Sequence, residues 1–333
     1  MRTVIIMAIS AVAAIAYIVL FSIDSNQENA KQRNLLFPDL FNVLDKVDKI
    51  EFLKSDNKLI VKKIKGEWVV ESADDYPARV STIKKFLLDL TEIKTIDIKT
   101  TDPSQYRNLA VNHIGEKGLN RLQITISIEQ GKEIVKFIVK EKFHNDNRTF
   151  IKKVGQKEVF ETQGALSLSA DKIKWLSADI IDLSSNAIKR ITVNHPDENF
   201  TLVRLDESSV QFKIKGLDKD SVEKSPTFTS AISAFLESLK FNDVKRKEII
   251  KDSKKLGRFT FKTTDGEEII VQDFETVLGV FTEFSITKVP SSESNSDFTN
   301  PDLIQKFVFK LPRYKRRLLD RKLSDLTKRK SID

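Results

Sequence analysis

The chain contains no cysteine, which excludes disulfide bridges, thiolate metal sites, a cysteine nucleophile and a lipid-modified N-terminal cysteine. Glycine and proline are scarce, with 10 and 8 residues in a chain of 333. The Gly-x-Gly-x-x-Gly, phosphate-loop and Gly-x-Ser-x-Gly patterns are missing, so nothing supports nucleotide hydrolysis, dinucleotide chemistry or a nucleophilic serine elbow. These absences favour a protein that is not an enzyme and that carries no cofactor.

Histidine is also rare, and the three residues do not form a metal-binding pattern. His113, His144 and His195 are too far apart in the sequence to pair across one helical turn. The stretches that begin at His144 and His195 are typical of polar turns, and a metal or catalytic role is the alternative. We therefore expect no metal site.

Acidic pairs and tryptophans each allow two interpretations. The acidic pairs are typical of solvated turns, with acid–base or cation-binding chemistry as the alternative, and they are Asp74-Asp75, Asp218-x-Asp220 and Glu267-Glu268. Trp68 and Trp175 are expected to pack in the core, with stacking on a sugar as the alternative.

Positive charge is concentrated at one end of the chain. The net charge is +8, and the segment from Arg313 to Lys330 holds nine Lys or Arg against two Asp. The rest is close to neutral, which argues against a nucleic-acid-binding surface. The segment has an apolar stripe from Tyr314 to Leu326 and predicts a docked terminal helix with a solvated basic face. Its alternative role is contact with anionic lipid or an acidic partner, and the candidate contacts are Arg313, Lys315, Arg316, Arg317, Arg321 and Lys322.

The only long uncharged apolar run lies at the N-terminus. Residues 4–23 form 20 positions without a charge, and a helix of this length spans about 30 Å, the thickness of a bilayer core. The run is longer than the apolar part of a cleaved signal peptide, and the residues that follow make a poor cleavage site. We predict an uncleaved transmembrane anchor, with a cleaved signal or a buried helix as alternatives.

The flanking charges predict the orientation of this anchor. Arg2 and the amino terminus precede the run, whereas the charges that follow it cancel. The positive-inside rule therefore favours a cytoplasmic N-terminus and a single-pass protein of the bacterial inner membrane. The bulk of the chain is expected to be periplasmic or extracytoplasmic.

Beyond a polar tether, the sequence predicts three short strands followed by a helix. Alternating apolar residues mark strands near 47–52, 59–64 and 68–70, and a helix follows Tyr76-Pro77. The same order recurs at 188–193, 200–205, 210–214 and after Pro226. At an offset of 149, six helix-region residues are identical, namely Pro77, Ser81, Ile83, Phe86, Leu87 and Leu90 with Pro226, Ser230, Ile232, Phe235, Leu236 and Leu239. The sequence thus predicts an internal duplication.

The second halves of the two units also agree. Two alternating runs flank Gly131 in the first, and two flank Asp265-Gly266 in the second, a good hairpin signal. Each unit is then expected to end in a strand and a helix, near 150–160 and 171–176 in the first and near 281–309 and 314–326 in the second. The Ser- and Asn-rich stretch 290–301 is expected to be a surface loop.

These patterns predict an α+β fold: an N-terminal transmembrane helix followed by two tandem repeats of a mostly antiparallel sheet with packed helices. The expected divisions are an anchor over 1–23, a tether over 24–40, repeat units over 41–185 and 186–327, and a basic tail over 328–333.

Several segments, in this order, resemble a bacterial envelope family known as domain of unknown function 4340. They are Leu36-Phe37-Pro38-Asp39-Leu40, Gly66-Glu67-Trp68, Tyr76-Pro77-Ala78, Lys174-Trp175-Leu176, Ala187-Ile188-Lys189-Arg190-Ile191 and Phe307 to Tyr314. One departure is the stretch from Tyr106 to Ala110, where members often carry Tyr-Gly-Leu.

The resemblance implies a membrane-anchored accessory or scaffold subunit without catalytic residues. Such proteins are often encoded beside a permease, an ATPase and an auxiliary protein of an ABC transport system, so the expected partners are membrane proteins and not nucleic acid. The alternative function is a binding module that recognises an envelope polymer or anionic lipid through the basic C-terminal helix.

Overall fold

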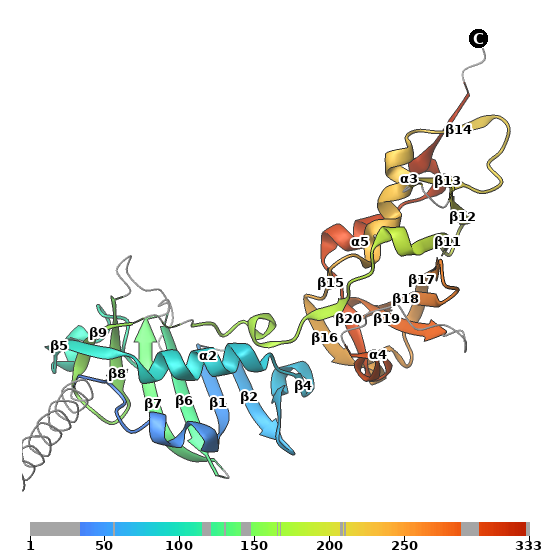
Figure 1. Cartoon of the computed structure of the whole chain (residues 1–333). Coiled ribbons are helices and arrows are strands. Elements are labelled where there is room, and N and C mark those ends of the chain that lie inside the picture. The colour runs from blue at the N-terminus through green and yellow to red at the C-terminus, as the bar shows by residue number, and fades with distance from the viewer. Residues whose placement is uncertain are drawn as a thin grey trace, which may run out of the picture. The chain divides into compact units, whose positions relative to one another are not determined.

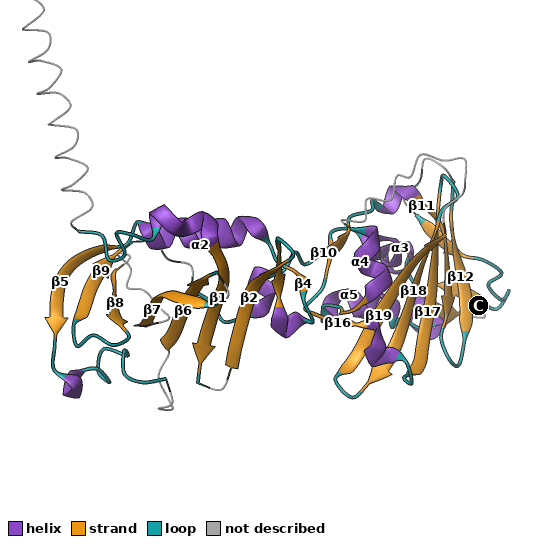
Figure 2. Cartoon of the chain, turned by 90° about the horizontal axis from the view of Figure 1, so that it is seen from below, coloured by secondary structure: helices purple, strands orange, loops and turns teal. Residues whose placement is uncertain are grey.

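The computed structural model describes residues 34–55, 57–114, 121–129, 131–140, 148–164, 166, 168–206, 209, 211–287 and 300–330. The chain divides into two compact units, unit 1 from Met1 to Leu176 and unit 2 from Ser177 to Asp333. Both units are mostly antiparallel sheet with few helices, which confirms the predicted α+β class (Figures 1 and 2). The predicted anchor over 4–23 lies outside the described residues, as does the tether up to residue 33.

Unit 1 is built on a sheet of nine strands in the order β4-β3-β2-β1-β6-β7-β8-β9-β5. The bounds are β1 (Val47–Lys54), β2 (Asn57–Ile64), β3 (Glu67–Val70), β4 (Tyr76–Pro77), β5 (Lys94–Thr100), β6 (Arg121–Ile128), β7 (Lys132–Lys140), β8 (Arg148–Lys153) and β9 (Val159–Gln163). Every neighbouring pair is antiparallel. The strands at 47–52, 59–64 and 68–70 are therefore confirmed.

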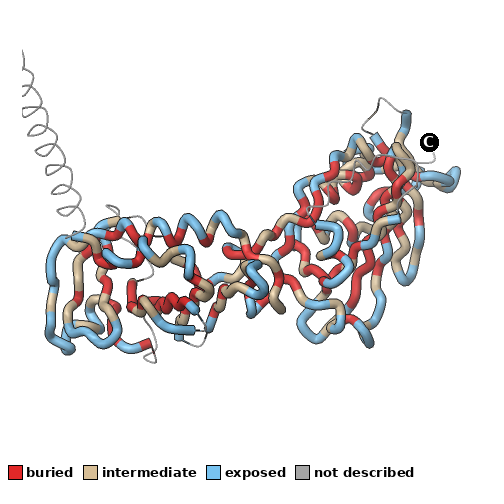
Figure 3. Tube along the Cα trace, turned by 60° about the horizontal axis from the view of Figure 1, so that its bottom comes forward, coloured by how far each residue is buried: buried red, intermediate tan, exposed pale blue. Residues whose placement is uncertain are grey.

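The helix α2 (Val80–Thr91) covers one face of this sheet (Figure 2). Its periodic apolar side chains are buried, and Phe86 lies with its ring centre 5.4 Å from that of Phe52 on β1. Trp175, in the 3-10 helix η4 (Lys172–Trp175), joins them at 4.7 Å from Phe52. Buried positions run through the interior of the unit (Figure 3), because alternate strand residues point toward α2.

Part of the opposite sheet face is also covered. The segment that contains the 3-10 helix η3 (Pro103–Gln105) supplies Val111 and Ile114, which form a buried cluster with Ile138 and Val159. The stretch from Tyr106 to Ala110, which differs from the Tyr-Gly-Leu of many family members, lies in this segment. Ala110 has a left-handed backbone with φ of 55°. Unit 1 thus has a main core under α2 and a smaller one on the other face.

Unit 2 is built on a sheet of eight strands in the order β13-β12-β11-β17-β18-β19-β20-β16. The bounds are β11 (Ile188–Asn194), β12 (Asn199–Arg204), β13 (Phe212–Ile214), β16 (Asp243–Arg246), β17 (Lys254–Thr263), β18 (Glu268–Thr276), β19 (Gly279–Thr287) and β20 (Phe307–Lys310). The helices are α3 (Pro226–Ser233), α4 (Pro301–Lys306), α5 (Arg313–Leu319) and α6 (Leu323–Leu326). Phe235, in the 3-10 helix η6 (Ala234–Leu236), stacks on Phe261 of β17 at 5.6 Å.

Two small ribbons complete unit 2. The strand β10 (Asp179–Ile181) pairs with β15 (Leu239–Lys240), and β14 (Ser221–Glu223) pairs with β21 (Thr327–Arg329). Because β10 pairs with a strand of unit 2, the compact units divide after Leu176, whereas the sequence predicts the division between 185 and 186. Pairing with β14 also places Lys328 and Arg329, the first two residues of the predicted tail, in a strand.

The first two strands of the two sheets pair in the same register. Ile50 pairs with Val61 in unit 1, and the residues 141 positions later, Ile191 and Leu202, pair with each other in unit 2. The same displacement relates a β-bulge, which follows Val47 in β1 and Ile188 in β11. The predicted hairpins are present in both, with Gly131 and Gly266 at positive φ.

Several predicted helices differ from the structure. The last matched position, Leu239, lies in β15 and not in a helix, and residues 172–175 form only a 3-10 turn. The predicted terminal helix from Tyr314 to Leu326 is broken into α5 and α6, because the intervening Lys322 has an extended backbone. The edge strand β5 was not predicted, since its side chains show little apolar alternation. Most of the predicted loop over 290–301 lies outside the described residues.

Candidate functional site

Unit 1 has a hollow of about 730 Å³ beside the segment Leu36–Leu40. The backbone N–H of Leu36 donates to the carbonyl of Ile93 at 2.8 Å, and the Phe37 ring lies 5.2 Å from that of Phe137. These contacts fix the segment against the sheet. The other wall comes from the start of β7 and the end of β8, with Glu133, Ile134, Val135, Lys136, Lys153, Val154 and Gln156.

Lys153 is the distinctive side chain of this hollow. Its ammonium lies 5.3 Å from the ring centre of Phe37 and 5.9 Å from that of Phe160. Burial lowers the pKa of Lys153, and the charge of Asp39 opposes this shift. Within the described part of the chain Lys153 has no ion pair. The hollow therefore combines apolar side chains and the charged Asp39, Glu133 and Lys136 with one cation that no anion pairs. Nothing in the sequence predicts this hollow, because Phe37 and Lys153 are far apart along the chain.

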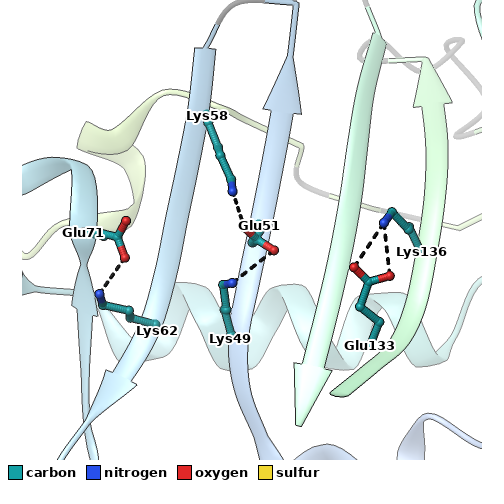
Figure 4. Close-up of polar contacts among 7 residues, drawn as sticks. All are labelled: Lys49, Glu51, Lys58, Lys62, Glu71, Glu133 and Lys136. Carbon is teal, nitrogen blue, oxygen red and sulfur yellow. Dashed lines mark hydrogen bonds and ion pairs between the residues drawn. The ribbon is translucent and has the colours of Figure 1, made fainter. Parts of the chain in front are cut away.

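The sheet face turned away from α2 carries paired charges (Figure 4). Glu51 on β1 accepts from Lys58 at 2.7 Å and from Lys49 at 3.2 Å, and Lys62 on β2 donates to Glu71 at 2.5 Å. Farther along, Lys136 binds Glu133 on the same strand at 3.1 Å, as Figure 4 also shows. The lysines of this face shown in Figure 4 are thus paired with carboxylates of the same unit.

The pKa values on this face follow from the pairing. Burial raises the pKa of Glu51, but the hydrogen bonds from Lys58 and Lys49 outweigh it and leave that pKa below its ordinary value. The hydrogen bond to Glu71 raises the pKa of Lys62. Both shifts favour the charged forms, which agrees with the ion-pair geometry of these groups.

The predicted C-terminal cations are mostly bound within unit 2. Lys315 is only 7% exposed, and its ammonium donates to the carbonyls of Ala234, Phe235 and Glu237. Burial lowers the pKa of Lys315, against the opposing charge of Glu237. A cation that ends a helical segment in this way stabilises its free carbonyl groups.

Three more of these cations have partners in the same unit. The Arg316 guanidinium lies 3.4 Å from Asp273 and 3.0 Å from Asp320. Arg321 donates to the carbonyl of Phe228 at 2.5 Å, and Lys322 pairs with Asp197. The last two candidates, Arg313 and Arg317, are exposed. Of the six candidate residues, four are therefore bound to partners within unit 2, and two have exposed side chains.

The acidic and histidine candidates do not converge on a reaction centre. Across the described ranges, His, Cys, Asp and Glu form no group of three able to hold a metal ion. Asp74 and Asp75 lie in a turn with left-handed backbones. His195 contacts the carbonyl of Arg321 at 2.9 Å and packs on Phe259. His144 lies outside the described residues.

The two tryptophans have different environments. Trp175 is buried, and its indole N–H donates to the carbonyl of Ser169 at 2.9 Å, so the predicted core position is confirmed. Trp68 is only partly buried, with the Lys63 ammonium 5.1 Å from its ring centre. The core prediction is wrong for Trp68, because its strand β3 lies near the sheet edge.

Among the helices of the described residues, none combines the length and the apolar character needed to cross a bilayer. The predicted anchor run over 4–23 lies outside those residues.

A family model matches the central part of the chain. The model described as "Domain of unknown function (DUF4340)" matches residues 68–244, which is more than half of the chain. The chain belongs to this family. The DUF4340 match begins in β3 and ends in β16, so it includes parts of both units. No curated protein matches the chain.

Proposed function

We propose that this DUF4340 chain is a non-catalytic accessory or scaffold subunit of an ABC-type transport system. Residues 4–23 would anchor it in the bacterial inner membrane as a single-pass protein, with both units on the extracytoplasmic side. The observation that carries the proposal is the uncharged 20-residue run ahead of two sheet units. The transport assignment rests on the family resemblance.

We further infer that the two units descend from one duplicated α+β unit. The shared displacement of 141 residues in strand pairing and in the bulge supports this, because register has no reason to agree between unrelated sheets. In a scaffold protein, one of the two units can bind one partner while the other unit presents a different surface to a second partner.

The hollow beside Leu36–Leu40 is the surface we assign to a membrane partner. It follows the anchor run closely in the sequence. It offers apolar side chains such as Phe37 and Val135 beside the Lys153 ammonium, which has no ion pair in the described ranges. An apolar segment that carries a carboxylate matches this chemistry, because it covers the walls and pairs with the ammonium.

The test is crosslinking of the tagged full chain in native membranes, extraction in mild detergent and quantitative mass spectrometry. We expect a permease and an ATPase to be enriched with the wild-type chain. Recovery of no membrane partner contradicts the accessory role.

A pair of variants tests the hollow itself. K153Q should lower recovery of the permease, whereas K85Q should not, since Lys85 lies exposed on α2 and pairs only with Asp89. Equal recovery with both variants, at unchanged thermal stability, removes the hollow as the contact but leaves the accessory role.

The alternative proposal is a binding module for an envelope polymer or anionic lipid. It is favoured by the exposed side chains of Arg313 and Arg317. Deleting residues 313–333 would remove the structural Lys315, so R313Q/R317Q is the sharper variant. Binding of the full chain to mixed micelles with phosphatidylglycerol should weaken in this variant, and unchanged binding contradicts the alternative.

A further inference from the structure

Unit 2 has a hollow of about 740 Å³ whose walls are strongly basic. Its lining consists of Lys189, Arg190, Val203, Arg204, Asp206, Lys262 and Thr264. Four of these seven side chains are cations and one is a carboxylate. Like charges kept this close repel one another, so a fold does not gather them unless something else compensates.

The bulge in β11 explains how two neighbouring cations reach the same hollow. Ile188 pairs with Thr263 and Arg190 pairs with Lys262, which leaves Lys189 as the extra residue. A bulge interrupts the alternation of side chains, so Lys189 and Arg190 both line the hollow instead of pointing to opposite faces. Lys262 is directly across from Arg190 on β17.

Arg204 forms a rigid part of the wall. Its Nε donates to the carbonyl of Ile188 at 2.8 Å, and its Nη1 donates to the carbonyl of Ser209 at 3.0 Å. The guanidinium also lies 5.4 Å from the ring centre of Phe212. These contacts fix a positive charge next to the bulge, because carbonyls and rings carry no net charge of their own. The Asp206 carboxylate of the same wall offsets part of that charge.

Two of the remaining cations lack an anionic partner. Lys262 pairs with Glu268 at 3.1 Å. Lys189 and Arg190 have no ion pair or hydrogen bond from their side chains to any residue in the described ranges. The hollow therefore presents two unpaired cations on an ordered strand, beside a third that is held in place.

The equivalent positions of unit 1 have a different charge pattern on the same strand pairing, so the strand pairing does not require the cations of unit 2. At the displacement of 141 residues, Lys49 corresponds to Arg190, Asp48 to Lys189 and Glu51 to Thr192. In unit 1 the bulge carries an acid beside a base, and Glu51 neutralises Lys49 at 3.2 Å (Figure 4). In unit 2 both acidic positions are replaced, by a lysine and by a threonine. Equivalent positions are thus self-neutralised in one unit and open to an external anion in the other.

We propose that this hollow of unit 2 is a binding site for a phosphate group. A phosphate monoester carries close to two negative charges at neutral pH, which matches the two unpaired cations. The planar guanidinium of Arg190 suits two phosphate oxygens at once, and the Lys189 ammonium supplies a second charge-assisted contact. The volume accommodates a ligand larger than the ion itself. The phosphate belongs either to a soluble phosphorylated molecule or to a phospholipid headgroup.

The site stands apart from the accessory role, because it uses neither the anchor nor the hollow of unit 1. It also differs from the basic C-terminal segment in every residue. If the phosphate site is disproved, the transport proposal is unaffected. If the transport proposal is disproved, the phosphate site is unaffected.

The test is isothermal titration of the full chain in an uncharged detergent with two probes, pyrophosphate and dihexanoyl phosphatidic acid, whose headgroup is a phosphate monoester, in the presence of a chelator. We expect saturable binding of at least one probe, weakened about tenfold or more by R190Q, because a charged hydrogen bond is lost. T192E should abolish binding by placing a carboxylate next to Arg190, as Glu51 lies next to Lys49. Thermal unfolding of each variant checks that the fold is retained.

The matched control is K49Q, which changes the equivalent residue of unit 1 and should leave binding unchanged. Saturation with pyrophosphate indicates a soluble phosphorylated ligand, and saturation with the lipid alone indicates a headgroup. The proposal is overturned if neither probe saturates, if R190Q and T192E bind like wild type, or if K49Q loses as much affinity as R190Q.

Discussion

Single cations in this chain have very different roles that their residue type does not reveal. Lys315 is buried and bonded to three carbonyls, whereas Arg317, two positions along the same helix, is exposed. Arg190 faces a hollow, but its counterpart Lys49 is neutralised by Glu51. Each difference depends on what the fold places opposite the charge, and it decides which residues are useful to mutate.

Replacing Lys315 should destabilise unit 2. K315M keeps most of the aliphatic stem but removes the ammonium that donates to three carbonyls, of which that of Ala234 also accepts from the backbone N–H of Glu237. We expect a loss of about 2–3 kcal/mol in the free energy of unfolding. Urea denaturation followed by circular dichroism measures it. R317Q is the control and should stay within about 0.5 kcal/mol of wild type. A K315M chain as stable as R317Q would show that these hydrogen bonds contribute nothing.

Asp273 should give stability an unusual pH dependence. It is 2% exposed, and burial raises its pKa, against the charge of Arg316 and the hydrogen bond from Thr282. The folded state therefore holds this proton more tightly than the unfolded state. Its contribution to stability is greatest at acid pH and declines as pH rises from about 4, the ordinary aspartate value, through the raised pKa.

D273N removes this titration. We expect the melting temperature of D273N relative to wild type to rise between pH 4 and pH 7. The comparison cancels the titration of groups that do not interact with Asp273, whereas Arg316, Asp320 and His195 act on Asp273 directly. A difference between the two proteins that stays constant across this range would contradict the assignment.

At the scale of elements, the apolar pattern places strands and helices but tertiary contacts set where they end. The helix α2 buries the predicted apolar positions Ile83, Phe86, Leu87 and Leu90, whereas Val80 at its first position is exposed. Its counterpart in unit 2 stops being helical before Leu239, because that residue pairs with β10. The terminal helix breaks into α5 and α6, each held by its own contacts with unit 2.

The packing of α2 predicts a strong effect of Phe86. Its ring lies 5.4 Å from Phe52 and 5.5 Å from Trp175, so F86A leaves a cavity between the helix and the sheet. We expect a loss of about 3–5 kcal/mol, measured by urea denaturation with tryptophan fluorescence. V80A, at a position 41% exposed on the same helix, should change stability by less than about 1 kcal/mol. Similar losses in both variants would contradict this packing.

At the scale of the whole chain, each unit has its own sheet and its own core. All strand pairings among the described residues join strands of one unit. Both tryptophans, Trp68 and Trp175, belong to unit 1. Tryptophan fluorescence therefore reports on unit 1, while circular dichroism reports on both units.

This division predicts separate unfolding transitions. F235A removes a ring that stacks on Phe261 in unit 2, so it should shift a transition seen by circular dichroism and leave the fluorescence transition in place. F86A should shift the fluorescence transition instead. If F235A moves both signals together, the two units unfold as one cooperative body.

The sequence by itself determined the α+β class, the family, most strands and the recurrence of one strand order. These follow from local apolar periodicity and turn residues, which are written in neighbouring positions. It did not determine the broken terminal helix, the burial of Lys315, the partial exposure of Trp68 or the two hollows. Those depend on which residues distant in the sequence meet, as Lys315 meets the carbonyls of η6 and Lys189 joins Arg204. Only the tertiary structure decides such meetings, because the energy of a charge or a ring is set by its surroundings and not by its neighbours along the chain.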